Sequence, residues 1–163
     1  MENPFSDPTP VEEIERWIDR FKRHFREVVT NTLIAGLGVF LISHFLLILS
    51  IQYFPEFFIS YLNPLFNSDG SRDVLFYMHP FVLTHSLSLL WNRFQKYFRG
   101  NILKTGLEFG VLYAVVALVP ILWITYAAME VNLTMVLSWL AYGLVQSAIA
   151  GVMFSFIRKK NWV

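Results

Sequence analysis

The chain has no cysteine, few charged residues and no motif typical of an enzyme. Without cysteine it has no disulfides, no thiol redox chemistry and no Cys-ligated metal or iron–sulfur centre. Charged residues make up only 15% of the 163 residues, whereas 55% are hydrophobic. There is no His-Glu-x-x-His, no Gly-x-Ser-x-Gly and no phosphate-binding glycine loop. This composition is typical of a membrane protein and gives no support to catalysis.

The apolar residues gather in four stretches, at about residues 30–53, 74–92, 106–128 and 133–157. A helix needs about 20 apolar residues to cross about 30 Å of hydrocarbon. Four such helices take up more than half of the chain, which leaves no room for a separate soluble domain. We therefore predict one all-α integral membrane domain over residues 1–163, a bundle of four transmembrane helices.

Basic residues alternate with these stretches. Twelve of the 13 Lys and Arg residues lie in three clusters, at residues 16–26, 93–104 and 158–160. The segments at the other ends of the predicted spans carry only Arg72, against Glu56, Asp69, Asp73 and Glu130. Basic residues beside membrane spans stay on the cytoplasmic side, the positive-inside rule. The pattern predicts a protein of a bacterial inner membrane with cytoplasmic N- and C-termini. Because the basic clusters are explained by this topology, they do not indicate nucleic-acid binding.

Residues 9–29 predict an amphipathic helix. Thr9 suits the N-cap, Pro10 the first helical position and Glu12 a capping box. Charged residues occupy one face, and apolar residues recur at helical spacing on the other: Val11, Ile14, Trp17, Ile18, Phe21, Phe25 and Val28. Such a helix beside a span lies in the membrane interface, with its rings in the acyl boundary. The alternative is that this face docks on a partner subunit.

Aromatic residues also mark the other predicted interfaces. Residues 54–73 predict an outer interfacial segment with a short helix between the first two spans, whose aromatic stripe includes Phe57 and Tyr61. The tryptophans fall near the predicted span ends, as in an aromatic belt: Trp123 and Trp139 on the outer side, Trp91 and Trp162 on the inner side.

Small residues repeat every four positions on the last two stretches. The third stretch has Gly106, Gly110 and Ala114, and the fourth has Gly143, Ser147 and Gly151. Small residues at this spacing let helix backbones approach closely. We predict that these stripes pack the two helices together, and the alternative is a self-association face that forms a homo-oligomer.

The polar residues inside the predicted spans are the candidates for function, because ionisable side chains are rare in a bilayer. They are His44, His79, His85 and Gln146, with Thr84 and Ser88 nearby. At 1.5 Å per residue, His44 and His79 lie level, each about 20 Å from the cytoplasmic boundary. His85 lies about two turns nearer that boundary.

Three interpretations fit these residues. His44 and His79 can be axial ligands of a haem or another tetrapyrrole, since histidine is a common ligand of haem iron. Alternatively, a small dimeric transporter or channel would use a polar track through His44, His85 and Gln146, with Thr84 and Ser88.

In the third interpretation each histidine only satisfies a neighbouring hydroxyl or backbone group. The protein is then a non-enzymatic structural or accessory component of a membrane assembly, without a cofactor or metal. Its partners are the lipid bilayer and other membrane subunits or further copies of itself. Because the sequence contains no catalytic constellation, this is the function we favour.

Overall fold

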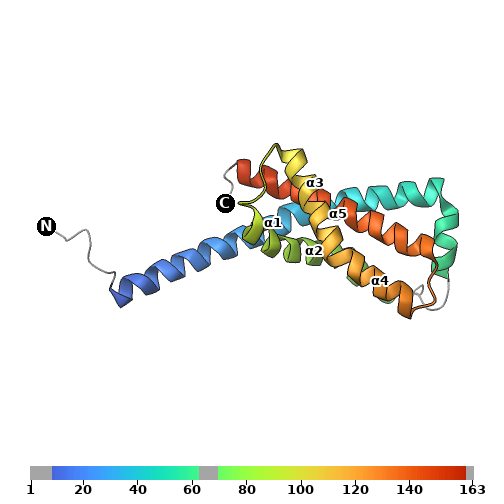
Figure 1. Cartoon of the computed structure of the whole chain (residues 1–163), viewed down its shortest axis with the longest axis horizontal. Helices are drawn as coiled ribbons and strands as arrows, with labels where there is room; N and C mark the ends of the chain where they lie inside the picture. The colour runs from blue at the N-terminus through green and yellow to red at the C-terminus, as the bar shows by residue number, and fades with distance from the viewer. Residues whose placement is uncertain (1–8, 63–69, 161–163) are drawn as a thin grey trace.

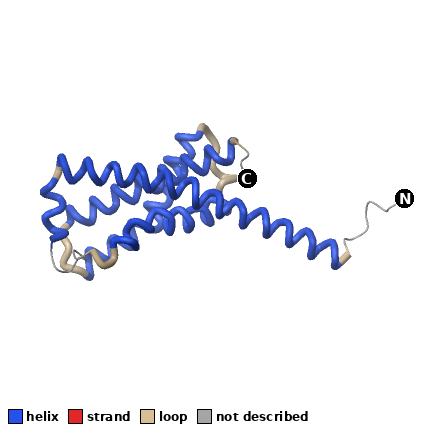
Figure 2. The backbone as a smooth tube through the Cα atoms, turned by 180° about the vertical axis from the view of Figure 1, so that it is seen from behind, coloured by secondary structure: helices blue, strands red, loops and turns tan. Residues whose placement is uncertain are grey.

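The computed structural model describes residues 9–62 and 70–160, and throughout these residues it contains helices and no strand (Figure 2). The α-helices are α1 (Pro10–Tyr53), α2 (Asp73–Phe94), α3 (Ile102–Tyr113), α4 (Val119–Ala128) and α5 (Leu133–Lys159). A 3-10 helix, Pro55–Leu62, follows α1, and a π-helical segment, Ala114–Leu118, joins α3 to α4. Four helical segments are long and apolar enough to cross a membrane, with Ile102–Ala128 counting as one. The predicted all-α chain with four membrane-spanning helices is confirmed to that extent.

The amphipathic region and the first span form one helix, α1, of 44 residues. Its start is the predicted capping box: the Thr9 N–H donates to Glu12 Oε2 at 2.8 Å, and the Glu12 N–H donates to Thr9 Oγ1 at 3.4 Å. Residues 10–26 extend beyond the bundle as an arm about 25 Å long (Figure 1). The predicted interfacial helix is thus an extension of the span, with no break between the two.

An aromatic cluster forms the centre of the bundle. Trp91 of α2 packs edge-on against Phe109 of α3, with ring centroids 5.5 Å apart, and lies 5.8 Å from Phe154 of α5. The expectation that Trp91 belongs to an aromatic belt is wrong, because its side chain is only 2% exposed. Trp123 of α4 is 76% exposed, as a lipid-facing residue would be, and Trp162 lies outside the described residues.

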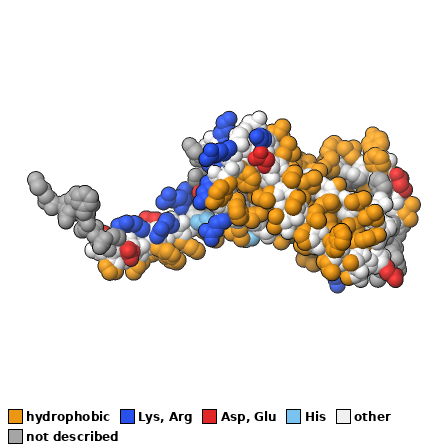
Figure 3. Space-filling model, viewed as in Figure 1, with side chains coloured by type: hydrophobic (Ala, Val, Ile, Leu, Met, Phe, Trp, Pro, Cys, Tyr) orange, Lys and Arg blue, Asp and Glu red, His pale blue; other side chains and the backbone are white. Residues whose placement is uncertain are grey.

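The basic clusters meet at one end of the bundle, which we call the basic end. Arg158, at the end of α5, donates from Nη1 to the backbone oxygen of Gln95 at 2.8 Å, and Gln95 follows α2. Lys and Arg side chains gather around this end and along one side of the arm (Figure 3). The three basic clusters therefore lie together, as the alternation along the sequence requires.

The third span changes from an α-helix to a π-helix at Ala114–Leu118, which ends two residues before Pro120. Proline has no N–H, and its ring clashes with the carbonyl four residues earlier, here Val116. The wider turn of a π-helix gives that carbonyl room, and such turns commonly mark functional regions. Beyond it, α4 has no buried residue, whereas α3 has four. Only the half of the span before the proline is therefore held inside the bundle.

The stripes of small residues on α3 and α5 face each other. A Cβ atom added to Gly110 would lie 2.8 Å from the backbone nitrogen of Ala148, and one added to Gly106 would lie 2.6 Å from that of Val152. From the other side, a Cβ atom on Gly151 would lie 2.9 Å from the Gly106 oxygen. Only glycine fits at these three positions, so the two backbones touch.

The other members of the stripes also lie inside the bundle. Ala114 is buried, and the fully buried Ser147 donates to the Leu144 oxygen at 3.0 Å and approaches the Gly110 oxygen at 3.4 Å. Gly143 faces Leu118 of the π-helical segment, whose Cδ1 would lie 2.7 Å from an added Cβ. This arrangement is the internal packing expected from the spacing.

Replacing Gly110 by alanine is expected to destabilise the folded bundle by about 1–3 kcal/mol, because the added methyl group must push α5 away. The control is Gly38→Ala, where the new Cβ would meet the flexible Met153 side chain, its nearest atom 3.2 Å away. We expect a change below about 1 kcal/mol there. Unfolding by sodium dodecyl sulfate in mixed micelles, followed by circular dichroism, measures both. Equal stabilities for the two variants would contradict the backbone contact.

Candidate functional site in the bundle

A group of polar side chains joins α1 to α5 near the middle of the bundle. The Gln146 side chain, which is 2% exposed, donates from Nε2 to Ser43 Oγ at 3.1 Å. One turn earlier on α5, the Tyr142 hydroxyl donates to the backbone oxygen of Ser43 at 3.3 Å. Residues four apart on a helix share a face, so Tyr142 and Gln146 reach the same point on α1.

His44 and His79 line one small cavity beside this group, together with Tyr77 and Gln146. His44 stacks on Phe40, with centroids 6.0 Å apart and planes at 11°, and its ring lies 5.9 Å from that of Tyr77. The cavity measures about 30 Å³, which is room for a water molecule or two. A macrocycle does not fit there, so the geometry does not favour a tetrapyrrole between these histidines.

A larger groove adjoins the small cavity and shares His79, Tyr142 and Gln146 with it. It lies between α2, the π-helical segment, α4 and α5 and has a volume of about 750 Å³. Its walls are mainly apolar, and Arg72 and Asp73 line the end where α2 begins. Sites for small ligands have volumes of about 300–1,000 Å³ and combine apolar walls with a few polar groups. Among the described residues, this groove is the best candidate site for a ligand.

His85 lies apart from these residues. Its Nδ1 atom is 3.4 Å from Thr32 Oγ1, and the hydroxyl hydrogen of Thr32 is donated to the Val28 oxygen at 2.7 Å. We therefore assign the ring proton of a neutral His85 to Nδ1, which donates to Thr32. The imidazole is exposed on the surface of α2 and does not line the cavity with His44 and Gln146.

Thr84 and Ser88 lie fully buried on another face of α2. The Thr84 hydroxyl lies 2.8 Å from the Pro80 oxygen and 3.3 Å from the Thr32 oxygen, so it bonds its own helix and faces α1. Ser88 Oγ and Asn92 Nδ2 are buried without a hydrogen-bond partner in the described part of the chain. The residues proposed for a polar track are therefore divided between a buried face and an exposed one.

The sequence interpretation did not include Ser43, Tyr142 or Asn92. Tyr142 and Asn92 carry a signal, because each stands four residues from a residue already singled out, Gln146 and Ser88. Ser43 shows none, since an isolated serine in a membrane helix commonly bonds only its own backbone.

No three His, Asp or Glu side chains within residues 9–62 and 70–160 are grouped so that they could hold a metal ion. The carboxylate of Glu108 lies 3.7 Å from the Lys104 ammonium, in an exposed ion pair on the first turns of α3. This pair accounts for the only acidic residue of Ile102–Ala128, which lies near the start of that span.

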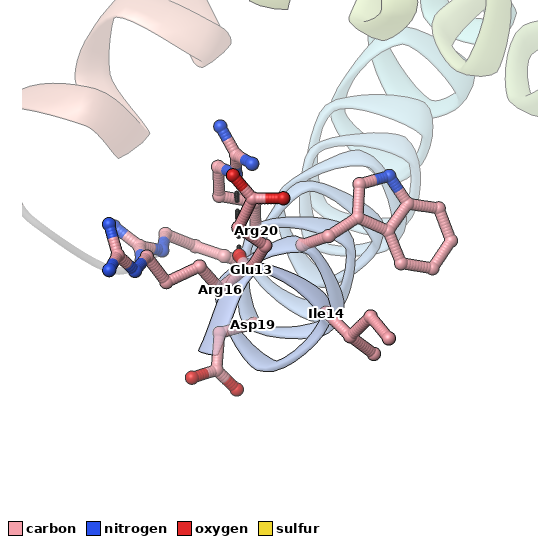
Figure 4. A pocket seen from close by; sticks show the side chains of 7 residues that line it. Glu13, Ile14, Arg16, Asp19 and Arg20 are labelled. Carbon is pink, nitrogen blue, oxygen red and sulfur yellow. Dashed lines mark hydrogen bonds between the residues drawn. The ribbon is translucent and has the colours of Figure 1, made fainter. Parts of the chain in front are cut away.

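The arm presents an exposed aromatic row. Trp17, Phe21 and Phe25 are each more than half exposed, and successive rings stack with centroids 5.7 and 6.4 Å apart. Arg16 and Arg20 project from one side of the helix and Ile14 from the other (Figure 4). The seven side chains drawn in Figure 4 line a pocket, and all of them belong to α1. The side chains of Phe57 and Tyr61, predicted at an interface, lie outside what the structure describes.

No family model, curated protein or solved structure matches this chain. Its function must therefore be inferred from the geometry of its own residues.

The Ser43–Gln146 contact is expected to couple α1 to α5 by about 0.6 kcal/mol and by at most about 1.7 kcal/mol, the range for hydrogen bonds between membrane helices. A double-mutant cycle of Ser43→Ala and Gln146→Leu, with stability measured in mixed micelles, gives this value. Ser86→Ala is the control partner, because the exposed Ser86 hydroxyl bonds the Val82 oxygen of its own helix. Additive effects of Ser43→Ala and Gln146→Leu would show that the contact contributes nothing.

Proposed function

We propose that this protein is a non-enzymatic accessory component of a membrane assembly and that the arm of α1 binds a helix of another subunit. One observation supports this most: the arm exposes a continuous apolar stripe, in a helix that runs on from the membrane span without a break. Large exposed apolar patches on proteins commonly mark interaction surfaces.

The stripe has the spacing of a helix–helix seam. Its residues are separated alternately by three and four positions: Val11, Ile14, Ile18, Phe21, Phe25 and Val28. This is the a/d pattern that pairs two helices side by side. The pattern continues past Val28 to Ala35 and Val39, which are fully buried inside the bundle. Neighbouring helices thus cover this face of α1 in the bundle, while in the arm it is bare.

The charges of the arm favour a protein partner over a position flat on lipid. The half next to the bundle is basic, with Arg20, Lys22, Arg23 and Arg26, and suits anionic headgroups. The distal half carries Glu12, Glu13, Glu15 and Asp19 against a single Arg16. An anionic membrane surface attracts the first half and repels the second. This division supports an arm that stands away from the membrane and presents its stripe to another helix.

Polar substitutions in the stripe are expected to release the protein from its assembly. The test pair is Ile18→Asn with Phe21→Asn, and the matched control is Arg16→Asn with Arg23→Asn on the opposite face. Native electrophoresis after extraction in mild detergent measures the particle mass. We expect the unmodified chain and the control in a larger particle and the stripe variant alone. An unmodified protein that runs as a single chain would overturn the proposal.

We also propose that the basic end faces the cytoplasm of a bacterial inner membrane, as the positive-inside rule predicts. The chain has no cysteine, so a single introduced cysteine reports its own side of the membrane. In intact cells with a permeable outer membrane, an impermeant maleimide should label Glu130→Cys, between α4 and α5. Asn101→Cys, just before α3, should react only after the inner membrane is opened. The reverse pattern would invert the topology.

A further inference from the structure

We propose that the groove between α2, α4 and α5 binds a zwitterionic phospholipid. The acyl chains lie against the apolar walls, an ester carbonyl accepts a hydrogen bond from His79, and the headgroup lies between Arg72 and Asp73. This site is independent of the arm and of the function proposed for it.

The groove exists because α4 is not packed into the bundle. The π-helical segment and Pro120 separate the buried half of the third span from α4, none of whose residues is buried. The walls include Leu75, Leu83 and Leu122. In a bilayer a groove between two spans meets hydrocarbon, so acyl chains fill it. What distinguishes a bound lipid from the surrounding ones is the set of polar groups that it meets.

His79 supplies the first of these groups. It lines the groove, and the structure gives it no hydrogen-bond partner among residues 9–62 and 70–160. Two other polar residues that line the groove already have hydrogen-bond partners: Gln146 Nε2 and the Tyr142 hydroxyl both donate to Ser43. A ring N–H left against hydrocarbon alone costs several kcal/mol in a membrane. An acceptor carried into the groove by the ligand removes that cost.

The charges at the groove's end define the headgroup. Arg72 and Asp73 line it together, six to seven residues before His79, or about 9–10.5 Å along the helix. A guanidinium binds phosphate well, and a carboxylate binds an ammonium group. A lipid with phosphate and amine satisfies both, whereas an anionic lipid leaves Asp73 beside a like charge. In a glycerophospholipid the ester carbonyls lie on the chain side of the phosphate, which is where His79 stands relative to Arg72.

The test is native mass spectrometry of the detergent-purified full chain, mixed with phosphatidylethanolamine or with phosphatidylglycerol of the same acyl chains. We expect one phosphatidylethanolamine to be retained with an apparent affinity roughly threefold to tenfold above that of phosphatidylglycerol, the effect of one charge-assisted contact. Equal retention of the two lipids would mean nonselective boundary lipid and would overturn the proposal.

Substitutions in and outside the groove test whether the retained lipid binds there. Leu122→Trp fills it and should remove the retained lipid, whereas Ile124→Trp, on a 61% exposed side chain of the same helix, should not. His79→Phe should weaken retention roughly threefold to tenfold, and His85→Phe should leave it unchanged. Asp73→Asn should abolish the preference between lipids, because Asp73 is the group that distinguishes an ammonium headgroup from an anionic one. Asp73 and His79 are exposed positions, so these two variants remain informative if Leu122→Trp disturbs folding.

Two results would contradict this site: identical retention in the Leu122→Trp and Ile124→Trp variants, or full retention in His79→Phe. The stripe variants of the arm should bind the lipid normally, which separates a failure here from a failure of the proposed assembly role.

Discussion

The backbone contact between α3 and α5 determines the rest of the bundle. In a bilayer no hydrophobic effect drives helices together, so they associate where their surfaces fit closely. Gly106, Gly110 and Gly151 provide that fit, since a Cβ atom at any of them would overlap the facing helix. With α5 held in this way, Gln146 reaches Ser43 on α1 and Phe154 reaches Trp91 on α2. The same contact ends near the π-helical segment, and the groove opens beyond it.

The intramembrane polar residues fall into two groups that differ in their partners. Thr84, Ser147 and Gln146 lie between helices, and each makes hydrogen bonds to a neighbouring helix or to its own backbone. These residues fix the arrangement of the helices. His79 lies at the edge of the groove without a partner in the described residues, which makes it available to a ligand. Depth in the membrane does not separate these roles. Buried Ser88 also has no partner in the described residues, and His79 differs from it because His79 lines the groove.

Sequence patterns predicted the features that depend on one helix at a time. Composition and charge placement predicted the four apolar helices, and residue types at the first turn predicted the Thr9–Glu12 capping box. Counting along a helix predicted that His44 and His79 lie at the same level, and in the structure both line one cavity. Counting along a helix does not show which neighbouring helix each of its faces contacts. The belt role expected for Trp91 is therefore wrong, because its side chain is buried, and His85 faces Thr32 and does not line the cavity that Gln146 lines.

The groove could not be predicted for a further reason. Proline is common in membrane helices, and the same residue type has different consequences here. Pro80 stands inside a continuous α2 and is buried, with the Thr84 hydroxyl 2.8 Å from its oxygen. Pro120 is exposed and follows a π-helical segment, after which α4 carries no buried residue. The neighbouring helices decide between these outcomes, and a single sequence does not reveal them.

The size of the side chains along one face of α1 changes where the arm leaves the bundle. Inside the bundle the buried face carries Asn31, Ala35 and Gly36, and the small residues let α2 approach closely: a Cβ on Gly36 would lie 2.6 Å from the Phe81 ring. In the arm the same face carries Phe21 and Phe25, which would hold a neighbouring helix further away. Large apolar residues suit association in water, where burying each such side chain contributes about 1.5–3 kcal/mol. In lipid the hydrophobic effect adds nothing to their burial. The change from large to small residues near Val28 therefore matches a change of solvent, and it supports an arm built to meet a partner outside the membrane.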